Sequence, residues 1–447
     1  MSTNDQSPPP WMDEVPWGDE AGAPPPPGPR IVTEEERVQD DLDNQPDPEV
    51  WWTLNLKKIG SKDDAKWVPL GTPANIECIL RRDRRWVGKI RTNDFTGDTE
   101  VHIPTEEAPG PMTTVSMIRI RMWIERVYSF VPKDVDVGAV ILSIGDENKY
   151  HPIAEHLRSL KWDGMPRVND MLTRYFKAED SELHRAFAKC WMVSAVARAM
   201  EPGSKVDTAL ILVGSQGARK STACRVLAGS DDLYSDTLLD FNSKDLYESL
   251  YGVWIYELAE LDSFGAKEQP KVKAVLSSRK DRYRRPYAKG PEARKRQAVF
   301  IGTTNEAEFL GDRTGSRRFW PVRVGKVDIE ALEKDRDALW AEAVMLYDAG
   351  EQWWLSDALS AELKVANSEY TVKDPWDSTI TNWVEEHVPN GRQGFTIATV
   401  LIDALGMEIG KSDMRHQKRA GSVLRGMGYK RRRKALNGRF VSLWYRG

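Results

Sequence analysis

Three short apolar runs in the middle of the chain have the pattern of buried strands. They are residues 208–213 (Thr-Ala-Leu-Ile-Leu-Val), 253–257 (Val-Trp-Ile-Tyr-Glu) and 298–302 (Ala-Val-Phe-Ile-Gly). Between and around them, apolar positions repeat at helical spacing. Strands that alternate with helices are typical of a layered α/β domain. We therefore predict an α/β fold class for the part of the chain from about residue 207 to residue 324.

Helical patterns dominate on both sides of this α/β stretch. Residues 153–160 and 168–175 repeat apolar positions at helical spacing around a turn at 162–164. Residues 184–200 predict a buried helix that leads into the α/β core, and residues 328–366 predict a helical stretch after it. Before residue 177, short strand-like and helix-like segments alternate from residue 50, which predicts an α+β N-terminal region.

The last part of the chain, from about residue 371, predicts a small basic module. Residues 396–405 and 417–427 have helical patterns, and residues 429–434 and 439–445 read as strands joined by Asn437-Gly438, a strong hairpin turn. Helices followed by a basic hairpin describe a winged helix, whose second helix would enter a DNA groove. The alternative is a small packing domain with a positively charged rim.

The N-terminal segment lacks such patterns. Residues 1–48 contain 11 prolines, and residues 1–50 contain 13 acidic against two basic side chains. A segment of this composition buries too little apolar surface to offset its ordering entropy, so we expect disorder. Trp11 and Trp17 interrupt the pattern. They are either solvated, or part of a motif that docks a replication partner, or part of an acidic mimic that occupies the protein's own DNA site.

Composition narrows the class of protein further. The net charge of the 447 residues is −4, so the chain after the acidic segment is basic, which suits a polyanionic partner. Neither a signal peptide nor an apolar run long enough for a membrane span is present. Three isolated cysteines indicate neither disulfides nor a metal site. We expect a protein of the reducing bacterial cytoplasm.

A phosphate-binding loop follows the first apolar strand. Gly214, Gly217, Lys220 and Ser221 have the spacing at which backbone N–H groups and a helix N-terminus cradle phosphate, with Thr222 next in line. Lys220 would reach the β and γ phosphates of ATP, and the Ser221 hydroxyl would bind Mg²⁺. Arg219 occupies a position where the usual pattern has glycine. The alternative is a turn that has this sequence by chance.

Polar side chains end the other two apolar strands. Glu257 ends one of them, and Glu260 follows; if residues 258–262 begin a helical turn, the two carboxylates share a face. Such acids hold the water shell of a metal and polarise the attacking water, with Glu257 as the candidate metal ligand. Asn305, at the end of the third strand, could sense the γ phosphate, or could simply form a turn.

Arg317 and Arg318 follow a glycine turn. Paired arginines at such a place could reach the γ phosphate of a neighbouring subunit and stabilise charge in the transition state. The alternative is a solvated pair, of which one member stacks on Trp320.

Two basic segments are candidate nucleic-acid contacts. Residues 279–296 contain nine Lys or Arg residues with interleaved tyrosines, and residues 411–447 contain twelve Lys or Arg residues and one acid. Cations and aromatic rings together suit phosphate contact and base stacking, although a charge run is often only a solvated face. The candidate residues are Arg279, Lys280, Arg282, Arg284, Arg285, Lys289, Lys430, Arg431, Arg432 and Arg433.

The order of these blocks resembles the virulence-associated E family of phage and prophage proteins, which are related to superfamily 3 helicases. The resemblance spans about residues 60–330. It is carried by residues 157–167 (Leu-Arg-Ser-Leu-Lys-Trp-Asp-Gly-Met-Pro-Arg), 214–222, 257–260 (Glu-Leu-Ala-Glu), 273–287, 303–305 (Thr-Thr-Asn) and 314–321 (Thr-Gly-Ser-Arg-Arg-Phe-Trp-Pro).

The resemblance implies an AAA+-like P-loop ATPase core, placed at 178–370, that assembles into a homo-oligomeric ring, probably a hexamer. It implies Lys220 and Ser221 on nucleotide and Mg²⁺, Glu257 and Glu260 on metal and water, Asn305 as sensor and Arg317 and Arg318 as trans fingers. We expect an ATP-dependent DNA helicase or translocase of a phage replication module. The alternatives are an initiator or regulator that uses ATP as a switch, and an ATPase that acts on another protein.

Overall fold

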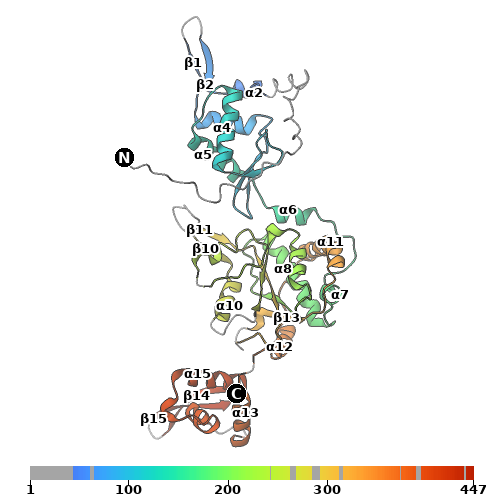
Figure 1. Cartoon of the computed structure of the whole chain (residues 1–447), viewed down its shortest axis with the longest axis vertical. Coiled ribbons are helices and arrows are strands. Elements are labelled where there is room, and N and C mark those ends of the chain that lie inside the picture. Colours follow the sequence, from blue (N-terminus) through green and yellow to red (C-terminus); the bar gives the residue numbers. More distant parts are fainter. Residues whose placement is uncertain are drawn as a thin grey trace, which may run out of the picture. The chain divides into compact units, whose positions relative to one another are not determined.

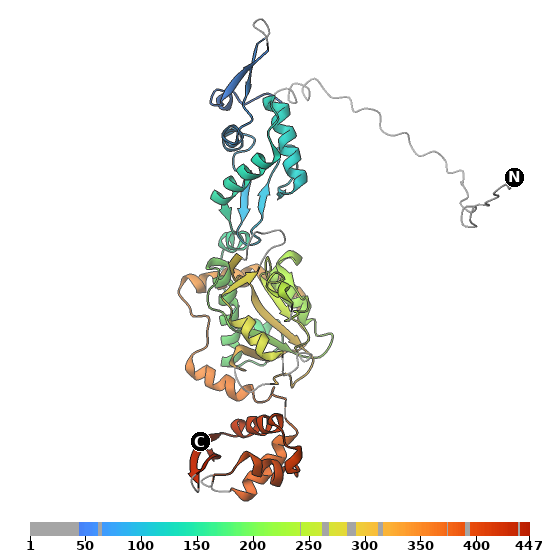
Figure 2. The same ribbon diagram turned by 90° about the vertical axis from the view of Figure 1, so that its left-hand side faces the viewer.

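The computed structural model describes residues 44–60, 65–241, 243–261, 268–283, 292–311, 316–372, 374–388, 394–436 and 439–447. The N-terminal segment with Trp11 and Trp17 lies outside these residues. The chain divides into two compact units, one with the residues up to Thr92 and Thr99–Asn148, the other with Asn93–Asp98 and Lys149–Gly447. Figures 1 and 2 show the ribbon in two views.

The first unit is a small α+β body. Its antiparallel strands β3, β4 and β5 lie side by side, and β1 and β2 form a separate hairpin. Ile76, Ile120, Ile124 and Ile141 are among the residues of its core. Its elements are α2 (Pro48–Trp51), β1 (Leu56–Ile59), β2 (Lys66–Pro69), α3 (Pro73–Arg82), β3 (Ile90–Asn93), β4 (Thr99–Val101), β5 (Gly110–Pro111), α4 (Thr114–Tyr128) and α5 (Asp134–Glu147).

The second unit contains a parallel five-stranded sheet with the order β13-β7-β12-β9-β8. Every residue of the three central strands is buried, as continuous apolar runs in a covered parallel sheet require. The strands are β7 (Ala209–Val213), β8 (Tyr234–Ser235), β9 (Ile255–Leu258), β12 (Val299–Thr304) and β13 (Phe319–Arg323).

Helices cover both faces of this sheet. Alternate residues of β7 enter different clusters: Leu210 packs with helices α8, α9 and α11, whereas Ile211 packs with α10. The helices are α6 (Pro152–Ser159), α7 (Met171–Arg174), α8 (Glu182–Met200), α9 (Lys220–Ala228), α10 (Gln269–Ser277), α11 (Ile329–Asp348) and α12 (Asp357–Ala366). Short elements β6 (Lys149–Tyr150), η1 (Asp231–Leu233), η2 (Lys244–Tyr247) and η4 (Ser316–Arg318) connect them.

A two-stranded hairpin, β10 (Lys280–Tyr283) with β11 (Glu292–Lys295), is anchored by a buried ion pair. The Arg296 side chain is fully buried, and its Nε donates to Asp281 Oδ2 at 2.8 Å. A second guanidinium nitrogen donates to the other Asp281 oxygen, and Nη1 donates to the carbonyl of Val275 at the end of α10. Two of the charges in the basic segment therefore fix the base of the hairpin.

The C-terminal module packs its helices and a hairpin around a separate cluster that includes Ile380, Leu424 and Trp444. Its elements are α13 (Trp376–His387), α14 (Ile397–Thr399) with the π-helical continuation η5 (Val400–Ala404), η6 (Ile409–Lys411), α15 (Met414–Gly426), β14 (Tyr429–Leu436) and β15 (Arg439–Arg446). The Asp413 carboxylate caps α15, which explains why this helix begins three residues before the expected 417.

Several boundaries differ from the sequence-based expectations. The division between the two units falls at Asn148, not near residue 177, because α6 and α7 contribute to the core of the second unit. Residues 168–175 contain only the single turn α7, and the stretch 328–366 is split into α11 and α12. Residues 258–260 are not helical. Helix α13 was not anticipated.

None of the described helices is both long and apolar enough to cross a membrane.

The buried pair of Asp281 and Arg296 predicts a strong effect on stability. Asp281→Asn leaves the Arg296 charge buried without its partner, which should cost about 3 kcal/mol or more. We expect the first thermal or urea transition of the full chain to shift by several degrees or the equivalent denaturant concentration.

Asp348→Asn is the matched control. Asp348 pairs with Arg158 at the surface, where both side chains are about half exposed, so its loss should cost less than about 1 kcal/mol. Equal effects of the two substitutions would contradict the anchoring role of Asp281.

Candidate nucleotide site

The glycine loop lies between the carboxyl end of β7 and the first turn of α9. The Gly214 N–H donates to the carbonyl of Thr304, and the N–H of Val327 donates to the carbonyl of Ala218. A Cβ on Gly214 would lie 2.8 Å from the carbonyl oxygen of Val324, so only glycine fits at the start of the loop.

Two loop residues have left-handed backbone conformations. Gly217 has a φ of +80° and Arg219 a φ of +62° with a ψ of 29°. A left-handed conformation costs an ordinary residue about 1–2 kcal/mol and costs glycine almost nothing. The usual glycine at the position of Arg219 therefore has a conformational reason, and this chain tolerates strain there. The Arg219 side chain turns outward and pairs with Glu330 at 3.1 Å.

Lys220 points back over the loop. Its Nζ donates to the carbonyls of Gly214 at 2.7 Å and Ser215 at 3.0 Å, and to Asn305 Oδ1 at 3.0 Å. Asn305 follows β12, the strand next to β7 in the sheet. The structure thus brings together two candidate residues that lie 85 positions apart.

Glu257 is a buried carboxylate that accepts three hydroxyl hydrogen bonds. It is 1% exposed, and its Oε1 accepts from Ser221 Oγ at 2.7 Å and from Thr303 Oγ1 at 2.5 Å. Its Oε2 accepts from the hydroxyl of Tyr234 in β8. The acid therefore ties α9 to three strands of the sheet, and its negative charge is satisfied without a basic partner.

This carboxylate shifts the protonation of its neighbours. Burial and the hydrogen bond to Glu257 raise the pKa of Tyr234 far above its ordinary value, so the phenol stays a proton donor. Burial and the charge of Glu257 also raise the pKa of the Cys224 thiol well above its usual range. Both groups are neutral at physiological pH.

Glu260 lies apart from Glu257, at the rim of a cavity of about 320 Å³. Glu260 is exposed, and its backbone is left-handed with a φ of +50°. Strain of this kind in a residue other than glycine often marks a functional position. The cavity is lined by Gln216, Gly217, Ala218, Arg219, Lys220, Ser221, Thr222, Ala259, Glu260, Thr303, Thr304 and Asn305.

The donor set fits a magnesium nucleotide. The described residues contain no cluster of three or more His, Cys, Asp or Glu side chains that could bind a metal by themselves. Mg²⁺ needs few protein ligands when phosphates and water complete its shell. Ser221 Oγ and Glu257 could supply protein oxygens, while Lys220 and the N-terminus of α9 could face the phosphates.

Arg317 and Arg318 lie far from this cavity, near the amino ends of the strands, whereas the cavity lies at their carboxyl ends. They precede β13, which runs parallel to β7 with Phe319 opposite Ala209 and Arg323 opposite Val213. The length of β7, about 13 Å, separates the two edges. Arg317 is exposed, and Arg318 Nε donates to Ser277 Oγ at 2.9 Å. Trp320 stacks on Phe187, with the rings 5.3 Å apart.

Seven of the ten candidate nucleic-acid residues lie among the described residues, and all seven are exposed. Arg279, Lys280 and Arg282 are in or beside β10. The others are consecutive on β14: Lys430, Arg431, Arg432 and Arg433. Arg284, Arg285 and Lys289 lie outside the described residues.

Sequence reasoning missed three partners of the site. Tyr234 and Thr303 donate to Glu257, and Ser277 holds Arg318. Thr303 lies at the end of the third predicted strand, two residues before Asn305, so the sequence pattern could have predicted its place in the site. Tyr234 belongs to a segment with no distinctive motif. Ser277 lies in the block 273–287 that carries the family resemblance, but the sequence assigns it no role.

The fold and site together define a parallel α/β domain with a glycine loop, a buried strand-end acid and a strand-end asparagine on one edge. Residues 157–372 match the virulence-associated protein E-like domain. This match confirms the resemblance to that family, although it begins later than the expected residue 60.

The other comparisons add little. No curated protein matches the sequence. Among solved structures, the apo C-terminal region of NrS-1 (305–718) is similar with a TM-score of 0.49 and 14% identity, over 80% of this chain and 96% of that chain. A second structure of that region has a TM-score of 0.47 and 14% identity, over 85% of this chain and 100% of the other.

The backbone of Arg219 predicts an unusual order of stability. Arg219→Gly and Arg219→Ala both remove the pair with Glu330, but only glycine relieves the left-handed conformation. We expect the glycine variant to be more stable than the alanine variant by about 1 kcal/mol in urea unfolding. An alanine variant of equal or greater stability would contradict the strain.

Burial predicts the reactivity of the three cysteines. Raised pKa values leave Cys224 and Cys190 (raised to about 11) as neutral thiols at pH 8, where thiolate is the reactive form. Half-buried Cys78 should therefore take a single maleimide label in the native chain, as counted by mass spectrometry. The urea-unfolded chain, as control, should take three; native labelling at Cys224 would contradict the packing around Glu257.

Proposed function

We propose that this chain is an ATP-dependent DNA helicase or translocase of a phage or prophage replication module. The observation that carries the proposal is the convergence of Lys220, Asn305, Ser221 and Glu257 at one edge of the parallel sheet. In open α/β sheets, ligands bind at the carboxyl edge of the strands. The virulence-associated protein E-like domain spans all four residues.

Each residue has a distinct role in the proposed hydrolysis of ATP. The loop from Gly214, with Gly217 as its flexible point, would wrap the phosphates, with Lys220 on the β and γ groups and Thr222 next to Ser221 in the first turn of α9. Ser221 and Glu257 would hold Mg²⁺. Asn305, whose Oδ1 accepts from Lys220, would donate from its amide NH2 to the γ phosphate.

The attacking water has two candidate acids. Glu257 is saturated by three hydroxyl donors, two of which, Thr303 and Tyr234, would remain after Ser221 turned to the metal. Glu260, which is exposed, lines the cavity beside the glycine loop, where it could turn toward a water. We therefore assign Glu257 to the metal and Glu260 to the activation of water.

The position of the arginines supports a site shared between subunits. Arg317 and Arg318 precede β13 at the amino edge of the sheet, so they lie away from the loop of their own chain. A positive charge supplied to the γ phosphate from this edge would have to come from a second copy. This geometry fits a closed ring, with a hexamer as the proposed state.

Exposed cations support a nucleic-acid substrate. The base of the β10–β11 hairpin is rigidly held, and its outer residues Arg279, Lys280 and Arg282 are exposed. In the described part of the C-terminal module, α13, α14 with its continuation η5, the short η6 and α15 precede the β14–β15 hairpin, an order that fits a winged helix. We propose that the β10–β11 hairpin contacts the translocated strand and that Lys430 to Arg433 contact duplex phosphates.

The proposal predicts a DNA-stimulated ATPase that depends on both halves of the shared site. Lys220→Ala should lower turnover about 100-fold or more, and Arg318→Ala should lower it about 1,000-fold or more. A mixture of the two variants should recover part of the activity, because some interfaces then combine an intact Lys220 with an intact Arg318. Phosphate release with and without single-stranded DNA measures all three.

Arg158→Ala, which removes an exposed arginine elsewhere in the domain, is the control and should be fully active. Melting temperatures check that each variant is folded. A rate of ATP hydrolysis that does not change when DNA is added would contradict the proposed translocase activity. Hydrolysis that responds to DNA, without displacement of a strand from a fork, would favour the ATP-switched initiator.

A further inference from the structure

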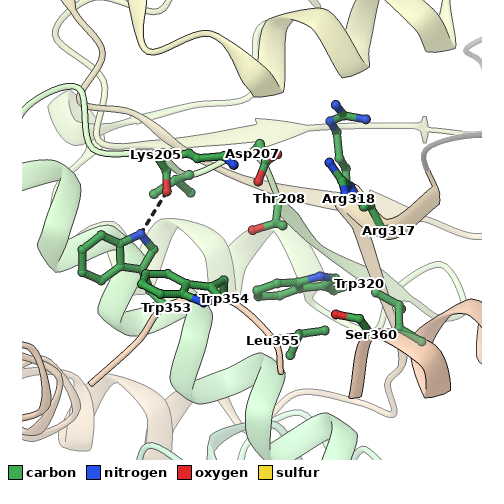
Figure 3. A pocket seen from close by; sticks show the side chains of 12 residues that line it. Lys205, Asp207, Thr208, Arg317, Arg318, Trp320, Trp353, Trp354, Leu355 and Ser360 are labelled. Atoms are coloured by element: carbon green, nitrogen blue, oxygen red, sulfur yellow. Dashed lines mark hydrogen bonds between the residues drawn. The ribbon is translucent and has the colours of Figure 1, made fainter. Parts of the chain in front are cut away.

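A second cavity, of about 420 Å³, lies near the amino ends of the strands, away from the glycine loop, and two of its lining residues are the proposed trans arginines Arg317 and Arg318. It is formed by the segment before β7, the start of β13, the segment before α12 and α12 itself. Its lining residues are Lys205, Val206, Asp207, Thr208, Arg317, Arg318, Trp320, Trp353, Trp354, Leu355, Ser360 and Leu363 (Figure 3).

Three tryptophans give this cavity an aromatic wall. Trp320 is buried and held by stacking on Phe187. Trp353 is fixed by its indole N–H, which donates to the carbonyl of Lys205 at 2.9 Å, the dashed line in Figure 3. Trp354 meets Trp353 edge-on at 5.4 Å and is 55% exposed. A large aromatic ring at the mouth of a preformed cavity offers a stacking surface.

The polar groups of the cavity are of two kinds. Lys205 and Arg317 are exposed cations. Asp207 and Thr208, half-buried just before β7, add acceptor oxygens. In the view of Figure 3, the three indoles lie in a row below Lys205, Asp207 and Thr208. Cations beside an aromatic wall suit phosphate, and acceptors suit the amino groups of a base.

Hydrogen bonds link the walls of the cavity to the base of the β10–β11 hairpin. Gly203, two residues before Lys205, accepts from Arg279 Nε at 2.7 Å and donates to the carbonyl of Arg296. On the other side, Arg318 is bonded to Ser277, two residues before Arg279. The exposed cations Arg279 and Lys280 therefore stand next to the cavity wall.

We propose that this cavity binds one nucleotide unit, with the base stacked on Trp354 and the phosphate held by Lys205. Asp207 accepts from an exocyclic amino group of the base. The unit belongs to a single strand that also contacts the β10–β11 hairpin, or is a free nucleotide of the same chemistry. The inference deepens the proposed contact with DNA but requires no step of ATP hydrolysis.

The acidic segment with Trp11 and Trp17 is the rival occupant, because it also combines aromatic rings with negative charge. Asp207 favours the nucleotide, since its carboxylate can accept from a base amino group, whereas residues 8–20 contain no Lys, Arg, Asn or Gln side chain. A peptide of residues 8–20 therefore serves as the competing probe.

The test is the anisotropy of a labelled single-stranded 12-mer of dC, titrated with the full chain carrying Lys220→Ala, without ATP. Every sample carries Lys220→Ala, so a difference in affinity between two samples does not arise from the proposed ATP site. Trp354→Ala should weaken binding about fivefold or more, because a stacked base contributes about 1–3 kcal/mol. Trp354→Phe keeps a ring and should recover most of the affinity.

Trp52→Ala is the matched control, since Trp52 is another exposed tryptophan, in the first unit; it should bind as the parent does. Competition with unlabelled dC 12-mer or with dCMP tells the strand from the free nucleotide, and either competitor supports the site. Unchanged affinity in Trp354→Ala overturns the proposal. The proposal is also overturned if the peptide of residues 8–20 binds in a way that depends on Trp354 and the 12-mer does not.

Discussion

The buried carboxylate of Glu257 is the constraint on which the rest of the candidate site depends. A carboxylate removed from water needs hydrogen-bond donors, and here three hydroxyls supply them. These hydroxyls come from α9, β12 and β8, so satisfying one charge fixes the glycine loop against the sheet. The same contact that could hold a metal thus also sets the position of the first turn of α9.

The parallel direction of the strands then decides which functions can meet. All strands of the sheet point the same way, so Glu257 and Asn305 gather with Lys220 at the carboxyl edge. Arg317 and Arg318, placed before β13, are confined to the amino edge. The two groups of residues that the proposed ATP site needs therefore lie at opposite ends of the strands and cannot meet within one chain.

Apolar runs with polar ends were enough to predict the three central strands β7, β9 and β12 and the residues that follow them, but not β8 or β13. Those residues follow strands directly, and parallel strands bring their ends together whatever the sequence between them. Tyr234 was beyond prediction, because its contact with Glu257 depends on β8, a strand of two residues with no pattern of its own. The cavity beside Trp354 likewise needs four separated segments.

Charge counting alone misjudged the basic segment in an instructive way. Arg296 looks like one of nine equivalent cations, yet its side chain is fully buried and paired with Asp281. Burial of a charge at the base of the hairpin costs solvation, which the ion pair and the bond to Val275 offset. The result is a rigid base that presents Arg279, Lys280 and Arg282 outward. A flexible segment with the same charges would lose more conformational entropy on binding a phosphate backbone. Asp281 lowers the net positive charge of the segment, but by holding its base it reduces this entropy cost.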